Sequence, residues 1–453
     1  MHIDLLVAEI GSTTTTISAF DRLSESEPRF LGQAFHPTTV EEGDVLIGLS
    51  GATDALSCSL GVSGIEPKEM VATSSAAGGL KMTVHGLVYE MTVKAANEAA
   101  LGAGAIVKLV TVGEISPDDL QRVRDLKPNI ILLAGGVDHG ERKTALFNAR
   151  LLARLGLDIP IVYGGNIACR DEIERILGPK TCIVDNVYPR IDQLNVEPTR
   201  KVIQEVFEEH IVQAPGMTNV REMVTGTIIP TPAAVMEAAR LIRELIGDLV
   251  VVDVGGATTD IHSVTEGSEE IAAMLVAPEP FAKRTVEGDL GVFINAGHLA
   301  GQLGTEKMGR ELGFAVEPLL DDWGQIPDDD RARSLVLRLT QGAAEIAISR
   351  HVGRTSHLYG PTGRVSIAEG KDLTAVRWLI GTGGPLTRLP GGQEVLEGIM
   401  GRKRPMALMP REAAVLIDRD YIMAAVGAIA QSHPHAAGRL LARSFGITLP
   451  VGV

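Results

Sequence analysis

Residues Leu249–Asp260 read Leu-Val-Val-Val-Asp-Val-Gly-Gly-Ala-Thr-Thr-Asp, and this segment carries the strongest fold signal in the chain. Its first six residues have the apolar, β-branched character of a buried strand, and the glycines after them predict a tight turn. Strand character resumes at Ile261–Val264. The segment is therefore predicted to form a strand, a glycine turn and a second strand, with Asp253 near the end of the first strand.

The beginning of the chain repeats this pattern. Residues 3–8, Ile-Asp-Leu-Leu-Val-Ala, run into Glu9-Ile10-Gly11-Ser12-Thr13-Thr14, and Thr15–Phe20 then alternate as a strand does. Placing Glu9 over Asp253, an offset of 244 positions (253 − 9), also places Gly11 over Gly255. Two such motifs that open two halves of one chain indicate an internal duplication.

Further elements follow each other in an α/β order. A strand at Phe30–Phe35 precedes a helix that carries Val45, Leu49, Ala52 and Leu56 at helical spacing. Between 104 and 190, charged helical segments separate four short apolar runs: Ile106–Val112, Ile130–Ala134, Ile159–Val162 and Cys182–Val184. This alternation predicts a small parallel sheet, which we interpret as an inserted α/β subdomain.

The predicted fold class is α/β, with two related lobes and this insert. The predicted boundaries are 1–103 for the N-terminal part of the first lobe, 104–190 for the insert, 191–248 for a connecting helical region, 249–415 for the second lobe and 416–453 for a C-terminal connecting helix and tail.

The two glycine turns have the composition of phosphate-binding hairpins. Glycines let backbone N–H groups approach phosphate oxygens closely, and hydroxyls add donors. The candidate residues are Gly11, Ser12, Thr13 and Thr14 in the first turn and Gly255, Gly256, Thr258 and Thr259 in the second. Ordinary β-turns rich in Gly and Thr are the alternative for either motif alone.

An acid precedes each turn. Glu9 and Asp253 can hold hydrated Mg²⁺ through water, since Mg²⁺ keeps several of its waters, and can orient an attacking water. A third loop follows the short strand Trp378–Ile380 and begins Gly381-Thr382-Gly383-Gly384. Its glycines Gly381, Gly383 and Gly384 could admit the flat face of a purine.

In order and content, the three segments resemble the phosphate-1, phosphate-2 and adenosine motifs of the actin, Hsp70 and hexokinase superfamily. Asp420–Ala428 resembles its C-terminal connecting helix, whose small residues let two helices cross closely. The resemblance implies a two-lobed ATPase fold of duplicated ribonuclease H-like domains that binds ATP and Mg²⁺.

More narrowly, five segments resemble the glutamate mutase L family over nearly the whole chain: Val7–Phe20, Thr73–Met82, Ile131–Arg142, Tyr163–Arg170 and Val286–Gly291. That resemblance implies an ATP-dependent reactivating chaperone whose partner is an adenosylcobalamin-dependent mutase, notably glutamate mutase. One departure is Glu9, where the wider superfamily usually has Asp. The extra methylene puts the geometry of hydrolysis in doubt more than nucleotide binding.

Composition excludes other classes of partner. A net charge of −15 repels a nucleic-acid backbone, and no stretch approaches the length of a membrane span. Cys58, Cys169 and Cys182 form no CxxC pair, so a reduced cytoplasmic setting is expected. Their scatter argues against an activator that drives electrons through a cysteine-held cluster.

A small-molecule kinase of the same fold stays open as an alternative, although residues 73–90 carry no sugar-kinase signature.

Other residues have two interpretations each. Glu287 and Asp289 are candidate catalytic carboxylates, with Asp289 as a helix N-cap as the alternative. His139 is more simply a turn histidine than a ligand, and His433 and His435 lack a third metal ligand. Cys58 is expected in the core.

Overall fold

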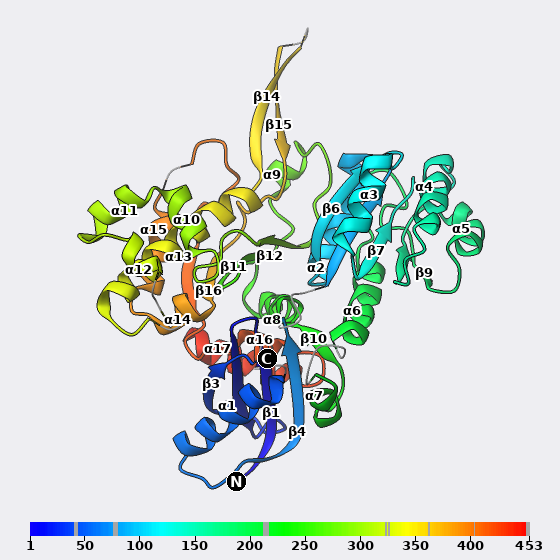
Figure 1. Cartoon of the computed structure of the whole chain (residues 1–453). Helices are drawn as coiled ribbons and strands as arrows, with labels where there is room; N and C mark the ends of the chain where they lie inside the picture. Colours follow the sequence, from blue (N-terminus) through cyan, green and yellow to red (C-terminus); the bar gives the residue numbers. More distant parts are fainter. Residues whose placement is uncertain are drawn as a thin grey trace.

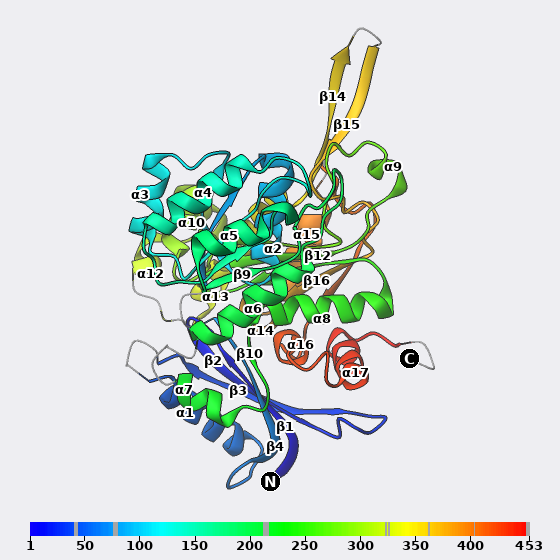
Figure 2. The same cartoon turned by 90° about the vertical axis from the view of Figure 1, so that its right-hand side faces the viewer.

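The structure is a computed structural model that describes residues 1–39, 44–75, 80–211, 217–321, 324, 327–360, 363–402 and 404–449. Residues 76–79 of the Thr73–Met82 segment lie outside the described residues, as do residues 212–216. The described chain forms two lobes and an insert, which Figures 1 and 2 show in two views.

The first lobe is built on a five-stranded sheet of order β10-β4-β1-β2-β3. The first three strands pair antiparallel, while β4 and β10 continue the sheet in parallel with β1. Helix α1 (Val45–Ser59) packs on β2 and β3, as the periodicity predicts. The strands are β1 (His2–Ile10), β2 (Thr14–Asp21), β3 (Arg29–Pro37), β4 (Glu66–Ser74) and β10 (Ile228–Pro230).

The second lobe repeats this sheet strand for strand, in the order β13-β12-β11-β16-β17 and with the same directions. Even the register matches, because Leu5 pairs with Phe20 and Leu249 pairs with Val264. The predicted duplication and its offset are thereby confirmed. The strands are β11 (Leu249–Val254), β12 (Thr259–Val264), β13 (Ala282–Glu287), β16 (Trp378–Thr382) and β17 (Ala414–Ile417).

The insert is a parallel sheet of order β6-β5-β7-β8-β9. Its strands are β5 (Lys81–Gly86), β6 (Ile106–Val112), β7 (Ile130–Leu133), β8 (Ile161–Tyr163) and β9 (Thr181–Ile183), joined by η1 (Tyr89–Val93), α2 (Lys94–Gly102), α3 (Pro117–Leu126), α4 (Lys143–Arg154), η2 (Ile167–Cys169) and α5 (Arg170–Leu177). The sheet thus takes an inner strand, β5, from before the predicted boundary at 104. Buried Thr83 and His85 interrupt the apolar run that would have marked this strand.

The region predicted as purely connecting, 191–248, also contributes a strand. It holds α6 (Glu197–Ile211), α7 (Met217–Met223) and α8 (Thr231–Ile246), but β10 within it completes the first lobe's sheet. Likewise, β17 straddles the predicted end of the second lobe at 415.

The remaining elements belong to the second lobe and the C-terminus: α9 (Glu269–Ala272), α10 (Ala296–Leu303), α11 (Thr305–Leu312), α12 (Glu317–Asp321), α13 (Asp330–His351), β14 (Arg354–Gly360), β15 (Gly363–Glu369), α14 (Gly384–Arg388), α15 (Gly392–Met400), α16 (Met423–Gly427) and α17 (Pro434–Phe445). The β14–β15 hairpin projects well beyond the body in both views (Figures 1 and 2). Among the described residues, no helix is long and apolar enough to cross a membrane.

The two lobes share one core around α8 and α16. Leu5 and Val7 of the first sheet belong to the same buried cluster as Leu249 and Val251 of the second. The helices cross closely, because a β-carbon at Gly427 would lie only 1.8 Å from the carbonyl oxygen of Ala234. This confirms the close crossing that the resemblance implied.

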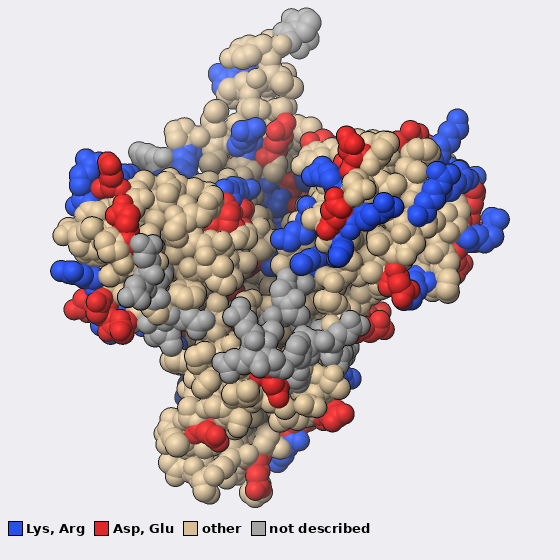
Figure 3. All heavy atoms as spheres, in the orientation of Figure 1, with Lys and Arg blue, Asp and Glu red and all other residues tan. Residues whose placement is uncertain are grey.

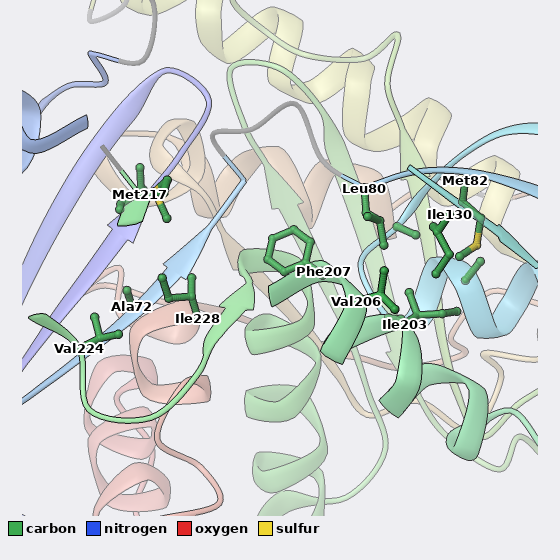
Figure 4. Packing of buried hydrophobic residues seen from close by; sticks show 14 of the residues in the cluster. Ala72, Leu80, Met82, Ile130, Ile203, Val206, Phe207, Met217, Val224 and Ile228 are labelled. Carbon is green, nitrogen blue, oxygen red and sulfur yellow. The ribbon is translucent and has the colours of Figure 1, made fainter. Parts of the chain in front are cut away.

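A second cluster runs from the first sheet into the insert. Figure 4 shows Ala72 and Ile228 on the side of the first lobe, Met82 and Ile130 on the side of the insert, and Phe207 of α6 between them. The insert therefore shares a hydrophobic core with the first lobe. On the face drawn in Figure 3, acidic and basic side chains are interspersed, with Lys and Arg gathered over the insert.

Candidate functional site

The two predicted phosphate hairpins are the same turn built twice. The Gly11 N–H donates to the Thr14 carbonyl at 2.9 Å, and the Gly255 N–H donates to the Thr258 carbonyl at 2.9 Å. We call residues Gly11–Thr14 the first hairpin and Gly255–Thr258 the second hairpin. Each lies at the end of the first strand of its lobe, directly after Glu9-Ile10 or Asp253-Val254.

The hairpins meet across the two lobes. A β-carbon placed at Gly256 would lie 3.4 Å from Oγ1 of Thr13, and equally close to the Phe293 side chain. Two turns that are 244 positions apart in sequence therefore form one continuous surface.

The second hairpin presents unused N–H groups. Its carbonyls at Gly255 and Gly256 accept hydrogen bonds from the N–H groups of residues 292–294 at 2.8–3.2 Å, and the Ala257 carbonyl accepts one from the Asn295 amide at 3.0 Å. In a trans peptide the N–H points opposite to the carbonyl. The N–H groups of Gly256, Ala257 and Thr258 thus point away from that loop, and they donate to no acceptor in the described part of the chain. Such a row of free N–H groups is an anion-binding nest.

The first hairpin is arranged in the same way. Thr38 occupies its carbonyls, since the Thr38 hydroxyl donates to Gly11 at 2.8 Å and the Thr38 N–H donates to Thr13 at 2.9 Å. Within the ranges the structure describes, the N–H groups of Ser12 and Thr13 have no acceptor. Two sets of donors are therefore available at the meeting point of the lobes.

Neither acid before the hairpins has a partner among the described residues that would stabilise its charged form. Glu9 and Asp253 are half-buried, and neither carboxylate has a hydrogen bond or ion pair to any described residue. Burial raises the pKa of Glu9 to about 7, with the charge of Asp418 adding to the shift. Burial also raises the pKa of Asp253 well above its usual range, and Asp260 and Glu9 reinforce the effect. A cation between these acids would relieve the repulsion.

The donor set fits Mg²⁺ held through water. No three His, Cys, Asp or Glu side chains of the described residues lie close enough to hold a metal ion directly. Mg²⁺ dehydrates reluctantly and is commonly bound through one or two carboxylates together with substrate phosphates. Glu9 and Asp253 beside two phosphate nests suit that mode.

Asp260 is a different kind of acid. It pairs with Asp253 across β11 and β12, but Arg284 neutralises it through an Nη2–Oδ1 contact of 2.6 Å between two buried side chains. Its other oxygen accepts a hydrogen bond from the Thr258 hydroxyl at 3.0 Å. Asp260 therefore positions the second hairpin and leaves Asp253 as the acid without a partner.

The predicted adenosine loop reaches this site at one glycine. Gly383 has φ +89°, and a β-carbon there would lie 2.2 Å from the Val254 carbonyl and 2.8 Å from Oδ1 of Asp253, so only glycine fits. Gly384 begins α14. Gly381 lies behind the loop, where a β-carbon would meet the side chains of Leu396 and Ile417.

Thr259, a predicted site residue, and Arg388, which follows the predicted adenosine loop, both have structural partners. The Thr259 hydroxyl is buried and donates to the Leu290 carbonyl at 2.8 Å. Arg388, the last residue of α14, contacts the Gln33 side chain of the first lobe and lies 5.7 Å from the centre of the Tyr421 ring. The loop of the second lobe is thereby tied to the first lobe.

Sequence reasoning missed Asp418 and Tyr421. Asp418 is fully buried at the end of β17, accepts hydrogen bonds from Thr382 and Ser444 at 3.0 and 2.6 Å, and accepts the N–H groups of Ile422 and Met423 at the start of α16. The charge of Glu9, then burial and the charge of Asp253, raises the pKa of Tyr421 well above its usual range. The available signal for Asp418 was an acid where an apolar strand ends, as at Asp253.

Glu287 and Asp289 are both engaged by Arg350. Arg350 lies 3.1 Å from Oδ1 of Asp289, whose pKa it lowers, and it also contacts Glu287, whose pKa burial raises. The helix that Asp289 was expected to cap begins only at Ala296. Both acids therefore carry a compensated charge, unlike Glu9 and Asp253.

The remaining candidates lie elsewhere. His139 is a turn residue with φ +60°, its N–H bonded to Asn166 at 2.9 Å. His433 and His435 flank the start of α17. Cys58 is exposed, so its predicted place in the core is wrong: it lies on the solvent side of α1, opposite Leu49 and Leu56. An open cavity of about 530 Å³ beside α11 and α12 contains none of the predicted site residues.

Two sheets of one topology, hinged through α8 and α16 and joined at paired glycine hairpins with an acid before each, define a two-lobed protein of the actin-like fold with duplicated ribonuclease H-like halves. Within that class, the chain belongs to the MutL protein family, whose profile matches residues 5–445. It is 36% identical over 455 residues to the protein MutL of Clostridium tetanomorphum, covering 96% of this chain and 98% of that one.

Solved structures with similarity to the chain include a nucleotide-free acetone carboxylase, at 12% identity and a TM-score of 0.38, covering 94% of this chain and 70% of that one. A nucleotide-free diol dehydratase-reactivating factor matches at 12% identity and a TM-score of 0.37, covering 95% and 99%.

Proposed function

We propose that this protein binds ATP with Mg²⁺ between its two lobes and hydrolyses ATP to reactivate an adenosylcobalamin-dependent mutase, with glutamate mutase as the first candidate. The observation that carries the proposal is the pairing of two N–H nests with two acids that have no hydrogen-bond or ion-pair partner among the described residues. Polyphosphate with a divalent cation supplies both missing partners at once.

The residues present would divide the work as follows. The N–H groups of both hairpins would bind phosphate oxygens, and Glu9 and Asp253 would hold hydrated Mg²⁺, which supplies charge stabilisation when bound. The loop from Gly383 would face the nucleoside. Both carboxylates end the strand before a hairpin and would also be placed to orient the attacking water.

The insert is attached in a way that makes its contacts depend on the relative position of the two lobes. It lies between β4 and β10 of the first lobe in sequence, yet α2 is fastened to β13 of the second lobe. Lys283 pairs with Glu98 of α2 at 3.2 Å, and Arg284 donates to the Leu101 carbonyl at 3.0 Å. Glu279, next to β13, pairs with Lys94 of α2. The insert thus contacts both lobes, so a change in the angle between the lobes would disturb its contacts with at least one of them.

This attachment favours a chaperone over a kinase. Arg284 joins the insert to Asp260, the cross-strand neighbour of Asp253, so the nucleotide site and the insert share one side chain. A small-molecule kinase of the same fold would need an acceptor pocket and a base beside it instead. The proposal places the reaction in the cytoplasm, where the three free thiols stay reduced.

The experiment is phosphate release from ATP, measured with and without an adenosylcobalamin-dependent mutase that has been inactivated by turnover. The proposal expects free phosphate and a faster rate when the mutase is present. A panel of small hydroxyl compounds tests the alternative, because transfer of the γ-phosphoryl group to one of them would establish a kinase.

A further inference from the structure

The five strands of the insert end at one edge of its sheet, and the loops at that edge expose large apolar side chains. Tyr89 after β5 is 58% exposed, and Ile191 after β9 is 69% exposed. Val88, Val112 and Ile167, at the ends of β5, β6 and β8, are exposed as well. Single exposed apolar residues are ordinary, but a group of them on one edge marks an interaction surface.

These loops are held in place by buried amides. The side-chain amide of Asn166 donates to the carbonyls of Gly140 and Glu141 at 3.2 and 3.1 Å, joining the loops after β8 and β7. That of Asn186 donates to the Gly136 carbonyl at 3.0 Å and to Asp138 at 2.9 Å, joining the loops after β9 and β7. The exposed residues therefore sit on a preorganised support, which lowers the entropy cost of binding.

Ile191 occupies the tip of a fixed turn. The Gln193 N–H donates to the Arg190 carbonyl at 3.1 Å, the Asp192 N–H donates to the Tyr188 hydroxyl at 2.9 Å, and Asp192 has φ +59°. The turn keeps Asp192 in the left-handed region and leaves Ile191 exposed to water. This arrangement does not stabilise the folded protein.

A cavity of about 140 Å³ opens among these residues. It lies between the loops after β5 and β7, where the strand order of the sheet reverses, the usual position of a binding site in an open parallel sheet. Its walls include Leu87, Val88, Met91, Val137 and Ile191, with Glu141 at one side. Small-molecule sites enclose roughly 300–1,000 Å³. This volume suits one large side chain.

The surrounding charge indicates what lies beside that side chain. The loops that follow the five strands contain six acids, Glu90, Glu114, Asp138, Glu141, Asp185 and Asp192, against two bases, Arg142 and Arg190. Among the described residues, Asp185 is the one of these acids with an ion-pair partner, Arg170 at 2.9 Å, so the edge keeps an excess of negative charge. A partner with Lys or Arg beside its apolar residue complements this edge.

We propose that the carboxyl edge of the insert sheet is a protein-docking surface, which takes one large apolar side chain of a partner into the cavity and pairs the partner's neighbouring bases with the acidic loops. Only the naming of the mutase as that partner rests on the proposed function. The surface lies on the body that Arg284 and Lys283 fasten to the second lobe, so a docked partner would follow the nucleotide state.

The test measures binding of the adenosylcobalamin-dependent mutase to the full-length chain, its Ile191→Arg variant and the control Ile47→Arg. Ile47 is a half-exposed isoleucine on α1 of the first lobe. We expect at least tenfold weaker mutase binding for Ile191→Arg, no change for Ile47→Arg, and an unchanged ATP-induced thermal shift in both. Equal mutase binding by all three proteins would overturn the docking surface and leave the proposed function standing.

Absence of mutase binding to the unaltered chain would contradict the proposed function instead. The docking surface can then be tested without the mutase. A phage-displayed library of random peptides is selected on the unaltered chain and counter-selected on Ile191→Arg. Enrichment of peptides with an aromatic or Leu residue flanked by Lys or Arg supports it, and binding should weaken with added salt. No enrichment, or self-association that Ile191→Arg abolishes, overturns the assignment to a basic partner.

Discussion

Thr13 of the first lobe and Gly256 of the second lie against each other, so that a β-carbon at Gly256 would be 3.4 Å from the Thr13 hydroxyl oxygen. Replacing Gly256 with Val would therefore put a branched side chain between the hairpins without a backbone clash. We expect ATP with Mg²⁺ to stabilise the unaltered protein by about 2.7 kcal/mol at a ligand concentration of 100 Kd, and Gly256→Val to lose this thermal shift.

Gly297→Val is the matched control, because Gly297 of α10 faces open space. Gly383→Val is a poorer test, since its positive φ and the nearby Val254 carbonyl would disturb folding itself. An ATP shift that persists in Gly256→Val would refute the placement of the phosphates.

Asp253→Asn separates hydrolysis from binding. The change keeps the shape of the side chain but removes the charge that would hold hydrated Mg²⁺, so phosphate release should fall by at least about 100-fold. Because the raised pKa of Asp253 means that its ionised form is unfavourable in the folded protein, the nucleotide-free variant should also unfold at a higher temperature. Unchanged phosphate release by the variant would show that Asp253 is not required for hydrolysis.

Glu9 gives the nucleotide-free protein a specific pH dependence. Its pKa rises from 4.5 to about 7 on folding, so the unfolded chain ionises first, and stability is lost as the pH rises from about 4.5 to 7. The loss is of the order of 3 kcal/mol. Glu9→Gln should match the unaltered protein near pH 4.5 and exceed it by up to that amount at pH 8 in urea unfolding. Parallel pH profiles for the two proteins would contradict the raised pKa.

Arg284 connects the nucleotide site with the insert. Its partner Asp260 is buried, so Arg284→Met should cost about 3–5 kcal/mol of unfolding free energy, and the double variant with Asp260→Asn should recover part of this loss. Hydrogen exchange then reports the coupling. ATP should change the protection of α2 less in the double variant than in the unaltered protein, because the double variant keeps only the Lys283–Glu98 and Lys94–Glu279 pairs. An identical response in both would exclude a role for Arg284 in this connection.

The sequence alone predicts the parts of the site that are local. The offset between Glu9 and Asp253 predicts both hairpins, and the matching turn hydrogen bonds at Gly11 and Gly255 confirm their equivalence. Strand β6 and helix α1 likewise follow from apolar runs and periodicity. These features depend on neighbouring residues, whose pattern is visible in a single chain.

Non-local features escape such reasoning. Asp418 reaches the site only because β17 lies beside β16, and the pattern around it also suits a solvated turn. The attachment of α2 to β13 joins residues more than 180 positions apart, as in the Lys94–Glu279 pair, through charged side chains that sequence patterns place on the surface. Burial of such pairs follows from the packing of the insert against the second lobe.

Recovery of mutase activity is the measurement that tests whether ATP is used to restore a mutase. A mutase inactivated by turnover is incubated with the protein, Mg²⁺ and fresh adenosylcobalamin, and its activity is followed after addition of ATP. We expect mutase activity to recover with the unaltered protein and ATP, and not to recover with Asp253→Asn or without nucleotide. Recovery that is independent of ATP, or no recovery while ATP is hydrolysed and the mutase is bound, would contradict the proposed function.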